Sequence, residues 1–175
     1  GRRGNAFTIE WDGRGDRSGE TVASATTYTA VLTATDVLGN TGTSAPVSID
    51  VDILVTRTGN GYSIRIASLE FEPDSWELRK KNCPILDRVA EVLKRHAPYK
   101  VIIEGHTDDS GDRDRNTMLS TRRARTVLRY LVRRGIEEDR LLARGLGPAA
   151  PCATNLTEQG RAQNRRIDFM LIKED

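Results

Sequence analysis

The chain has 175 residues, of which 37% are hydrophobic and 30% are charged. This composition suits one folded domain of ordinary size with a smaller appendage, and it excludes a disordered chain. No apolar run approaches the roughly 18 residues that a transmembrane helix needs, and no charged and then apolar leader opens the sequence. A start at Gly1 is what we expect of a piece of a longer protein, so membrane attachment is expected only through parts absent from this chain.

Charge divides the chain into two unlike parts, although the formal net charge is only +2. Residues 1–56 carry 4 Lys/Arg against 7 Asp/Glu, giving −3, whereas residues 57–175 carry 23 against 18, giving +5. The Gly-rich run at 57–61 falls where the charge changes. We therefore predict a β module at 1–56, a linker at 57–61 and a second domain at 62–175.

The N-terminal part shows the alternation of apolar and polar residues that is typical of strands. FTIEW alternates and stops at the turn pair Asp12-Gly13, and TYTAVLTATD and PVSIDVDILV follow, separated by the turn-rich run VLGNTGTSA. The apolar residues expected on one face are Tyr28, Ala30, Leu32, Ala34, Val47, Ile49, Val51 and Ile53. The pattern predicts an all-β piece with one buried face.

The string WDGRGDRSGETVAS, continued by TYTAVLTATDVLGN, resembles the immunoglobulin-like repeat of bacterial surface proteins and flagellar-hook cap proteins. The match covers only about the last half of such a module, since a complete sandwich needs about seven strands and about 100 residues. The resemblance implies a partial immunoglobulin-like module, either truncated or completed by a strand from elsewhere. We expect it to act as a spacer or stalk, or to contact other envelope proteins.

The C-terminal part adds helical periodicity to strands. Apolar stripes predict helices that end before Pro98 and before Gly135. A short helical turn is expected before the last strand, and strands are predicted at Tyr62–Phe71, Val101–Gly105, Arg140–Arg144 and Arg165–Ile172. The order βαβαβ(α)β predicts an α+β sandwich with helices on one face of a mixed sheet.

The stretch GHTDDSGDRDRNTMLSTRRA, from Gly105 to Ala124, joins the end of a predicted strand to a predicted helix. Such loops collect ligands, because backbone N–H groups point outward from a helix N-terminus. Asp108 lies in this loop, and the helical phase of Arg123 lets it project back toward Asp108. A carboxylate beside a guanidinium suits a zwitterionic ligand, but a plain Asp–Arg ion pair that stabilises the loop is the open alternative.

Several separated blocks carry a second resemblance: GHTDDSG, Asn116, LSTRRA, GLG at 145–147 and GRAQNRRI. They are similar in order and spacing to the peptidoglycan-binding domain shared by OmpA, the Pal lipoprotein and the stator protein MotB, over roughly residues 62–172. The resemblance implies non-catalytic binding of the peptidoglycan stem peptide, with its diamino acid held between Asp108 and Arg123. It also implies that Thr107 and Asn116 shape the loop, and that Arg165 or Arg166 closes the pocket.

One block departs from the family pattern. The family commonly has Phe-Asp after its first strand, whereas this chain reads FEPDSW, with Glu72 for the aspartate and then Asp74 and the bulky Trp76. Glu72, Asp74 and Asp108 would make the pocket acidic and favour a cationic lysine or ornithine side chain over the zwitterionic end of diaminopimelate. The alternative function is a protein–protein interaction module of the same fold whose pocket is degenerate.

Other interpretations of the charged residues are weaker. A metal loop would draw on His106 and several aspartates, but the EF-hand positions for glycine and glutamate are unfilled. Hydrolysis by Ser120, His106 and Asp108 lacks an oxyanion glycine motif. Nucleic-acid binding lacks the aromatic residues of a stacking platform, although many arginines crowd one helix: Arg122, Arg123, Arg125, Arg129, Arg133 and Arg134.

We therefore expect no catalytic residues, metal, cofactor or nucleic acid, and a periplasmic, outer-membrane-associated envelope location for the chain. The two cysteines, Cys83 and Cys152, lack the CxxC spacing of a zinc site. The sequence leaves open whether they form a disulfide or remain two buried thiols.

Overall fold

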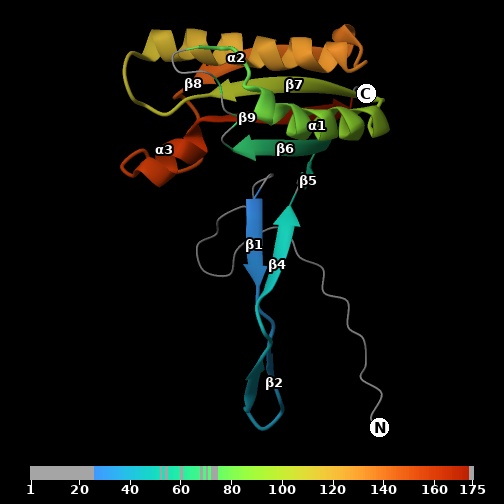
Figure 1. Cartoon of the computed structure of the whole chain (residues 1–175), viewed down its shortest axis with the longest axis vertical. Coiled ribbons are helices and arrows are strands. Elements are labelled where there is room, and N and C mark those ends of the chain that lie inside the picture. The colour runs from blue at the N-terminus through green and yellow to red at the C-terminus, as the bar shows by residue number, and fades with distance from the viewer. Residues whose placement is uncertain are drawn as a thin grey trace.

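The computed structural model describes residues 26–51, 53, 55–59, 61–67, 69, 71 and 75–173. They form a two-stranded arm and an α/β domain (Figure 1). The predicted first strand, FTIEW at 7–11, lies outside the described residues. None of the described helices is long and apolar enough to cross a membrane.

The arm is an antiparallel ribbon in two sections. Strand β1 (Thr26–Ala30) pairs with β4 (Val47–Val51), and β2 (Thr33–Thr35) pairs with β3 (Thr41–Thr43). The turn at its tip is held by Asp36, whose Oδ1 accepts hydrogen bonds from the N–H groups of Leu38 and Asn40, both at 2.9 Å. The predicted strand–turn–strand arrangement is thus confirmed at this place.

The buried face predicted for this arm is wrong for the described side chains, because every one from Thr29 to Ser48 is exposed. Leu32 is 54% exposed and Val47 is 59% exposed. A two-stranded ribbon has no second layer against which to pack, so alternation alone buries nothing.

The domain is built on a mixed five-stranded sheet with the order β5-β6-β9-β7-β8. Among the described strands of this sheet, only β7 and β8 pair in parallel, and the other ladders are antiparallel. The strands are β5 (Val55–Thr58), β6 (Gly61–Ala67), β7 (Tyr99–His106), β8 (Leu141–Gly147) and β9 (Arg166–Lys173). The predicted mixed sheet is confirmed.

The boundary of the domain differs from the one predicted from composition. Residues 57 and 58, expected in a linker, belong to β5, which pairs with β6 through the register Val55↔Ile64 to Thr58↔Gly61. The strand predicted to run to Phe71 ends at Ala67, and Phe71 forms only an isolated bridge with Leu78. Of the two glycines that suggested a linker, Gly59 lies in the turn after β5 and Gly61 begins β6.

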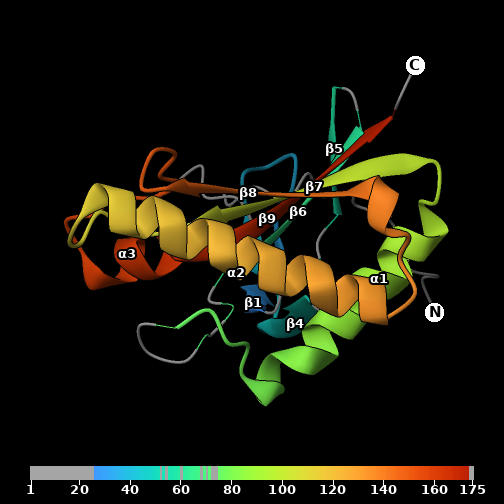
Figure 2. The same ribbon diagram turned by 90° about the horizontal axis from the view of Figure 1, so that it is seen from above.

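Helices α1 (Cys83–Arg95) and α2 (Arg113–Arg133) cover one face of the sheet, as Figures 1 and 2 show. The chain also forms two short 3-10 turns, η1 (Lys80–Asn82) and η2 (Glu138–Arg140), and the short helix α3 (Glu158–Asn164). The core between the helices and the sheet includes Ile64, Ile66, Leu86, Val89, Leu93, Val101, Ile103, Val127, Leu131, Ile167, Phe169 and Leu171.

Helix α2 ends where the sequence predicts. Gly135 adopts φ 86°, and the N–H groups of Gly135 and Ile136 donate to the carbonyls of Val132 and Leu131, at 2.9 and 3.1 Å. This is the Schellman arrangement, which favours glycine because a side chain is strained at positive φ. The predicted helix stop is confirmed.

Helix α2 approaches the ends of β7 and β8 closely because glycines line the contact. A Cβ atom at Gly105 would collide with the backbone of Ser120, and one at Gly145 would collide with Thr121 and Ser120. The Ser120 hydroxyl completes the contact: it donates to the carbonyl of Thr117 at 2.9 Å and accepts from the N–H of Gly147 at 3.0 Å.

Replacing Gly145 with alanine should therefore force α2 away from β8 and lower the free energy of unfolding by about 1–3 kcal/mol. Urea unfolding of the wild type and the variant measures the change. Gly59→Ala is the matched control, because nothing lies within 4 Å of the place that its new methyl group would take, and its φ is not positive. Equal stability of the two variants would contradict the close-contact explanation.

Candidate functional site

The candidate site lies where β7 ends and α2 begins. Thr107 and Asp108 follow β7 directly and are buried, and the N–H of Thr107 donates to the carbonyl of Gly147 at 3.0 Å. Asp112 closes the loop as the N-cap of α2, because its carboxylate accepts from the N–H of Arg115 at 2.8 Å. The sheet and the helix thus fix both ends of the loop.

The Asp108 carboxylate has two partners. Its Oδ2 lies 2.6 Å from Nη1 of Arg165, and its Oδ1 accepts from the N–H of Ser110 at 3.0 Å. Burial disfavours the charged form, but the hydrogen bonds of Arg165 and Ser110 outweigh it, so the pKa of Asp108 lies below its usual range. Asp108 is therefore an anion at neutral pH.

Arg165 is held in turn by a second carboxylate. Its Nη2 donates to Glu158 at 2.7 Å, and Glu158 also accepts from Arg161 at 2.8 Å. Glu158 opens α3 and Arg165 caps its end, so this short helix sets their distance. Glu158 was missed by sequence reasoning, although its place two helical turns before Arg165 is a usable signal.

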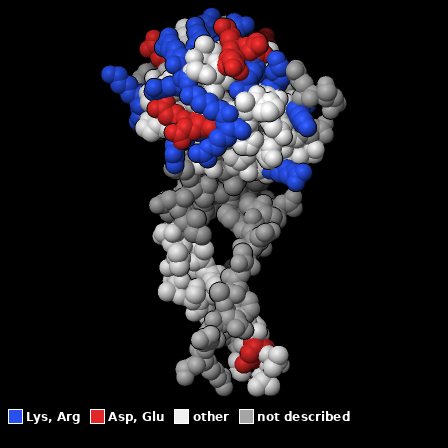
Figure 3. Space-filling model, turned by 90° about the vertical axis from the view of Figure 1, so that its right-hand side faces the viewer, with Lys and Arg blue, Asp and Glu red and all other residues white. Residues whose placement is uncertain are grey.

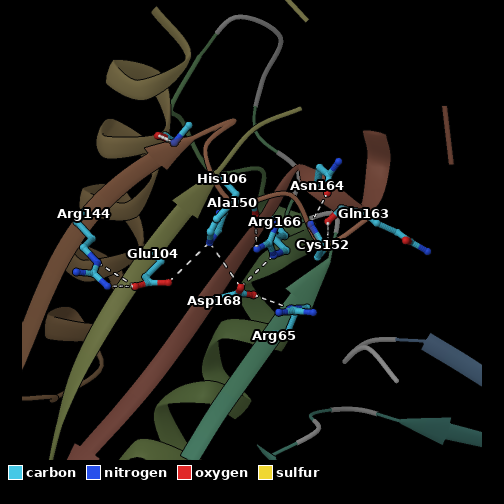
Figure 4. Close-up of polar contacts among 12 residues, drawn as sticks. Arg65, Glu104, His106, Arg144, Ala150, Cys152, Gln163, Asn164, Arg166 and Asp168 are labelled. Atoms are coloured by element: carbon cyan, nitrogen blue, oxygen red, sulfur yellow. Dashed lines mark hydrogen bonds and ion pairs between the residues drawn. The ribbon is translucent and has the colours of Figure 1, made fainter. Parts of the chain in front are cut away.

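Asn164, also missed, anchors the loop that precedes α3. Its side chain is fully buried, and it accepts from the N–H groups of Cys152 and Ala153 and donates to the carbonyl of Ala153, at 2.8, 3.0 and 2.9 Å. A buried amide that satisfies three backbone groups fixes the chain on either side of it. Figure 4 shows Asn164 beside Cys152. The loop and the start of β9 therefore hold Arg165, which follows Asn164, in place.

The other predicted residues have separate surroundings. Asn116 donates to the carbonyl of Ser110 at 2.8 Å, which ties the loop to α2. Arg123 donates to the carbonyl of Ser75 at 3.2 Å, and its guanidinium lies 4.7 Å from the ring centroid of Phe71. Glu72 and Asp74 lie outside the described residues.

A buried polar cluster on the sheet face opposite α1 and α2 was not anticipated. His106 Nε2 lies 3.5 Å from Asp168 and 3.9 Å from Glu104 (Figure 4). Asp168 also pairs with Arg166 at 3.0 Å and Arg65 at 3.1 Å. The signal was present in the sequence, because polar residues alternate with core residues in both β7 and β9.

Residues considered for a metal loop or for hydrolysis have structural partners instead. Among the residues that the structure describes, no three His, Cys, Asp or Glu side chains are placed to share a metal ion. Asp112 caps a helix, and the Ser120 hydroxyl is engaged in the contact between α2 and β8. Cys83 and Cys152 are both free thiols, and Cys152 is exposed rather than buried.

Comparison with known proteins identifies the family of the domain. The sequence pattern of the OmpA family matches residues 70–165. The chain belongs to the OmpA family. This OmpA-family chain is 37% identical over 120 residues to a probable lipoprotein, YiaD, of Escherichia coli, covering 68% of this chain and 55% of that protein. It is 41% identical over 104 residues to the peptidoglycan-associated lipoprotein of Pseudomonas aeruginosa, covering 59% of this chain and 61% of that one.

Solved structures agree with the family fold. The cell wall anchor of the T6SS from Pseudomonas aeruginosa superposes with a TM-score of 0.62 at 28% identity, over 70% of this chain and 88% of that chain. The shared part is the mixed sheet with its helices, which confirms the predicted α+β class. The chain spans little more than half the length of the two curated relatives.

The buried His106 should make stability depend on pH. Burial, aided by Arg166, lowers the pKa of His106 from 6.5 to about 4, although Asp168 and Glu104 oppose this. Between these two pH values the His106 imidazole binds a proton in the unfolded chain but stays neutral in the folded domain. The free energy of unfolding should therefore fall with falling pH, by at most about 1.4 kcal/mol per pH unit from this group.

Urea unfolding at several pH values between 4 and 6.5 tests this, with His106→Gln compared with wild type. The variant should lose part of the pH slope, whatever its absolute stability. His96→Gln is the control, because His96 is only half-buried. Parallel slopes for wild type and His106→Gln would contradict the argument.

Proposed function

We propose that the domain binds the peptidoglycan stem peptide without catalysis and so holds an envelope protein at the cell wall. The names of two similar proteins support this: one is a peptidoglycan-associated lipoprotein, and another is the cell wall anchor of the T6SS. The proposed location is the periplasm, in association with the outer membrane; two relatives are named as lipoproteins and a third, of Bordetella avium, as outer membrane protein A.

The observation that carries the proposal is the buried Asp108 carboxylate in a loop fixed at both ends, beside the guanidinium of Arg165. A carboxylate offers about four acceptor positions, of which Ser110 and Arg165 use two. An ammonium group of the diamino acid would use the remaining capacity. Arg123, with Arg165, would receive its carboxylate by charge-assisted hydrogen bonds.

Each remaining residue has a proposed part in this site. Thr107 and Asn116 shape the loop, and the buried Thr107 hydroxyl has no hydrogen-bond partner among the described residues, so it is available to a ligand. Glu72 and Asp74 border the pocket in this proposal. Binding at one site should be modest and should be strengthened by the many stem peptides of the wall.

The β arm is proposed to extend the domain or to contact other envelope proteins. Its exposed apolar residues suit either role, because no second layer formed by the described residues covers them. A partial immunoglobulin-like module completed by a partner strand is the form that we propose for it.

A second function is favoured by one observation: Asp108 is already paired with Arg165 in this structure. If that pair is permanent, the pocket is closed and the domain is a protein–protein interaction module. The two functions predict opposite results for the same variants.

Asp108→Ala and Arg123→Ala should each abolish binding to purified insoluble peptidoglycan, because each removes one of the two charges that grip the ligand. A pulldown, repeated with free stem peptide as competitor, measures binding. Arg133→Ala is the control, since it removes an exposed arginine from the far end of the same helix. Wall binding that survives both site variants, or no binding by well-folded wild type, would favour the interaction module.

Stem peptides that differ only at the third residue test the acidic pocket. Because Glu72 and Asp74 are proposed to add negative charge to the pocket, lysine and ornithine peptides should bind more tightly than the diaminopimelate peptide. Isothermal titration gives the three affinities, and Glu72→Gln should narrow the difference. A clear preference for diaminopimelate would refute the prediction.

A further inference from the structure

A groove of about 570 Å³ lies on the domain between the outer flank of α2 and strand β8. Leu128 of α2 and Leu141 of β8 give it an apolar lining, and Leu142 of β8 borders it. Leu142 is 57% exposed, which is high for a leucine in a strand. Neither the OmpA-family match nor the proposed stem-peptide site accounts for this surface.

The groove runs along an open strand edge. In the sheet that the described residues form, β8 is the last strand, and its ladder runs to β7 on one side. The other side of such a strand presents backbone N–H and C=O groups that a further strand can pair with. The shape of the groove and its backbone therefore suit an extended peptide.

Three arginines of α2, Arg122, Arg125 and Arg129, line the groove at helical spacing. No ion pair of Arg125 or Arg129 with a described residue is formed, and Arg122 stacks at 4.3 Å on the ring of Trp76. Like charges at this spacing destabilise a helix by a few tenths of a kcal/mol per pair, so an anionic partner would relieve the repulsion.

Acidic groups are scarce at this surface. Glu138 is the one carboxylate among the described residues that line the groove, against the three arginines. Figure 3 shows basic side chains spread over the α/β domain, whereas the described part of the arm carries few charges in this view. Charge complementarity thus points to an acidic occupant.

We propose that this groove binds an extended acidic segment of a partner protein, which adds to the edge of β8 as a further strand. Side chains of an added strand alternate between its two faces. One row, which faces α2, would be carboxylates that pair with Arg125 and Arg129. The other row, beside Leu142, would be apolar. Anionic lipid or a second copy of the chain would use the arginines without this alternation.

The groove and the stem-peptide site use different residues. The groove uses the solvent side of α2 and the first half of β8, whereas Asp108 and Arg165 lie in the loop after β7 and at the end of α3. The inference therefore does not rest on wall binding, and an experiment can contradict the proposed groove without contradicting the proposed stem-peptide site, or the reverse.

The test uses a capped ten-residue peptide of alternating glutamate and valine, titrated into the ¹⁵N-labelled chain. We expect amide shifts in Leu141–Arg144 and saturable binding. Arg125→Glu combined with Arg129→Glu should weaken binding by at least about tenfold, which corresponds to about 1.4 kcal/mol. The matched control is Arg95→Glu with Arg133→Glu, which makes the same charge change at exposed positions away from the groove.

Two further peptides separate strand addition from simple charge attraction. The same peptide with N-methyl groups on alternate residues cannot pair along one edge, and a lysine–valine peptide has the opposite charge. Both should fail to bind. Equal binding of the N-methylated peptide, or shifts confined to residues away from β8, would overturn the proposal.

The rival occupants give their own results. Arginine-dependent binding to phosphatidylglycerol vesicles without peptide binding would assign the groove to lipid. Arginine-dependent dimerisation in light scattering without peptide binding would assign it to a second copy. Either result overturns the proposal. Wall pulldown by the Arg125/Arg129 variant should equal that of wild type, and thermal unfolding verifies that the variant is folded.

Discussion

The close contact between α2 and the ends of β7 and β8 is the constraint on which the rest of the domain depends. Glycines at 105 and 145 let the helix backbone lie against the strands, and Ser120 ties the helix to Gly147. This contact fixes the loop between β7 and α2, so the Asp108 carboxylate has a defined place and direction. It also fixes the opposite flank of α2 above β8, where the arginine-lined groove lies.

Arginines make many of the polar contacts in this domain, and they differ in what they hold. Arg165 binds Asp108 and Glu158, Arg166 is buried against Asp168, and Arg140 donates to the carbonyls of three residues that end α1 and begin β7: Leu93, His96 and Tyr99. Arginine suits these positions because it stays charged and donates from several directions. The arginines of α2 that line the groove differ from these, since Arg125 and Arg129 have no such ion pair with a described residue.

The candidate site and the buried His106 cluster lie next to each other in sequence but have different partners. His106 ends β7 with its ring toward Asp168 and Glu104, and Asp108 follows two residues later in the loop. β7 ends at His106, so Thr107 and Asp108 belong to the loop rather than to the sheet.

The amino-acid sequence alone determined the family, the loop between β7 and α2, and the element order of the domain apart from β5, because periodicity, helix stops and separated motif blocks are local signals. It also singled out Asp108, Arg165 and Asn116, whose contacts in the structure tie the loop together. Only the tertiary structure decided that Asp108 pairs with Arg165, 57 residues away, and that Glu158 supports it. The arm shows the same limit, since alternation predicts a strand face, but burial requires a second layer that comes from elsewhere in space.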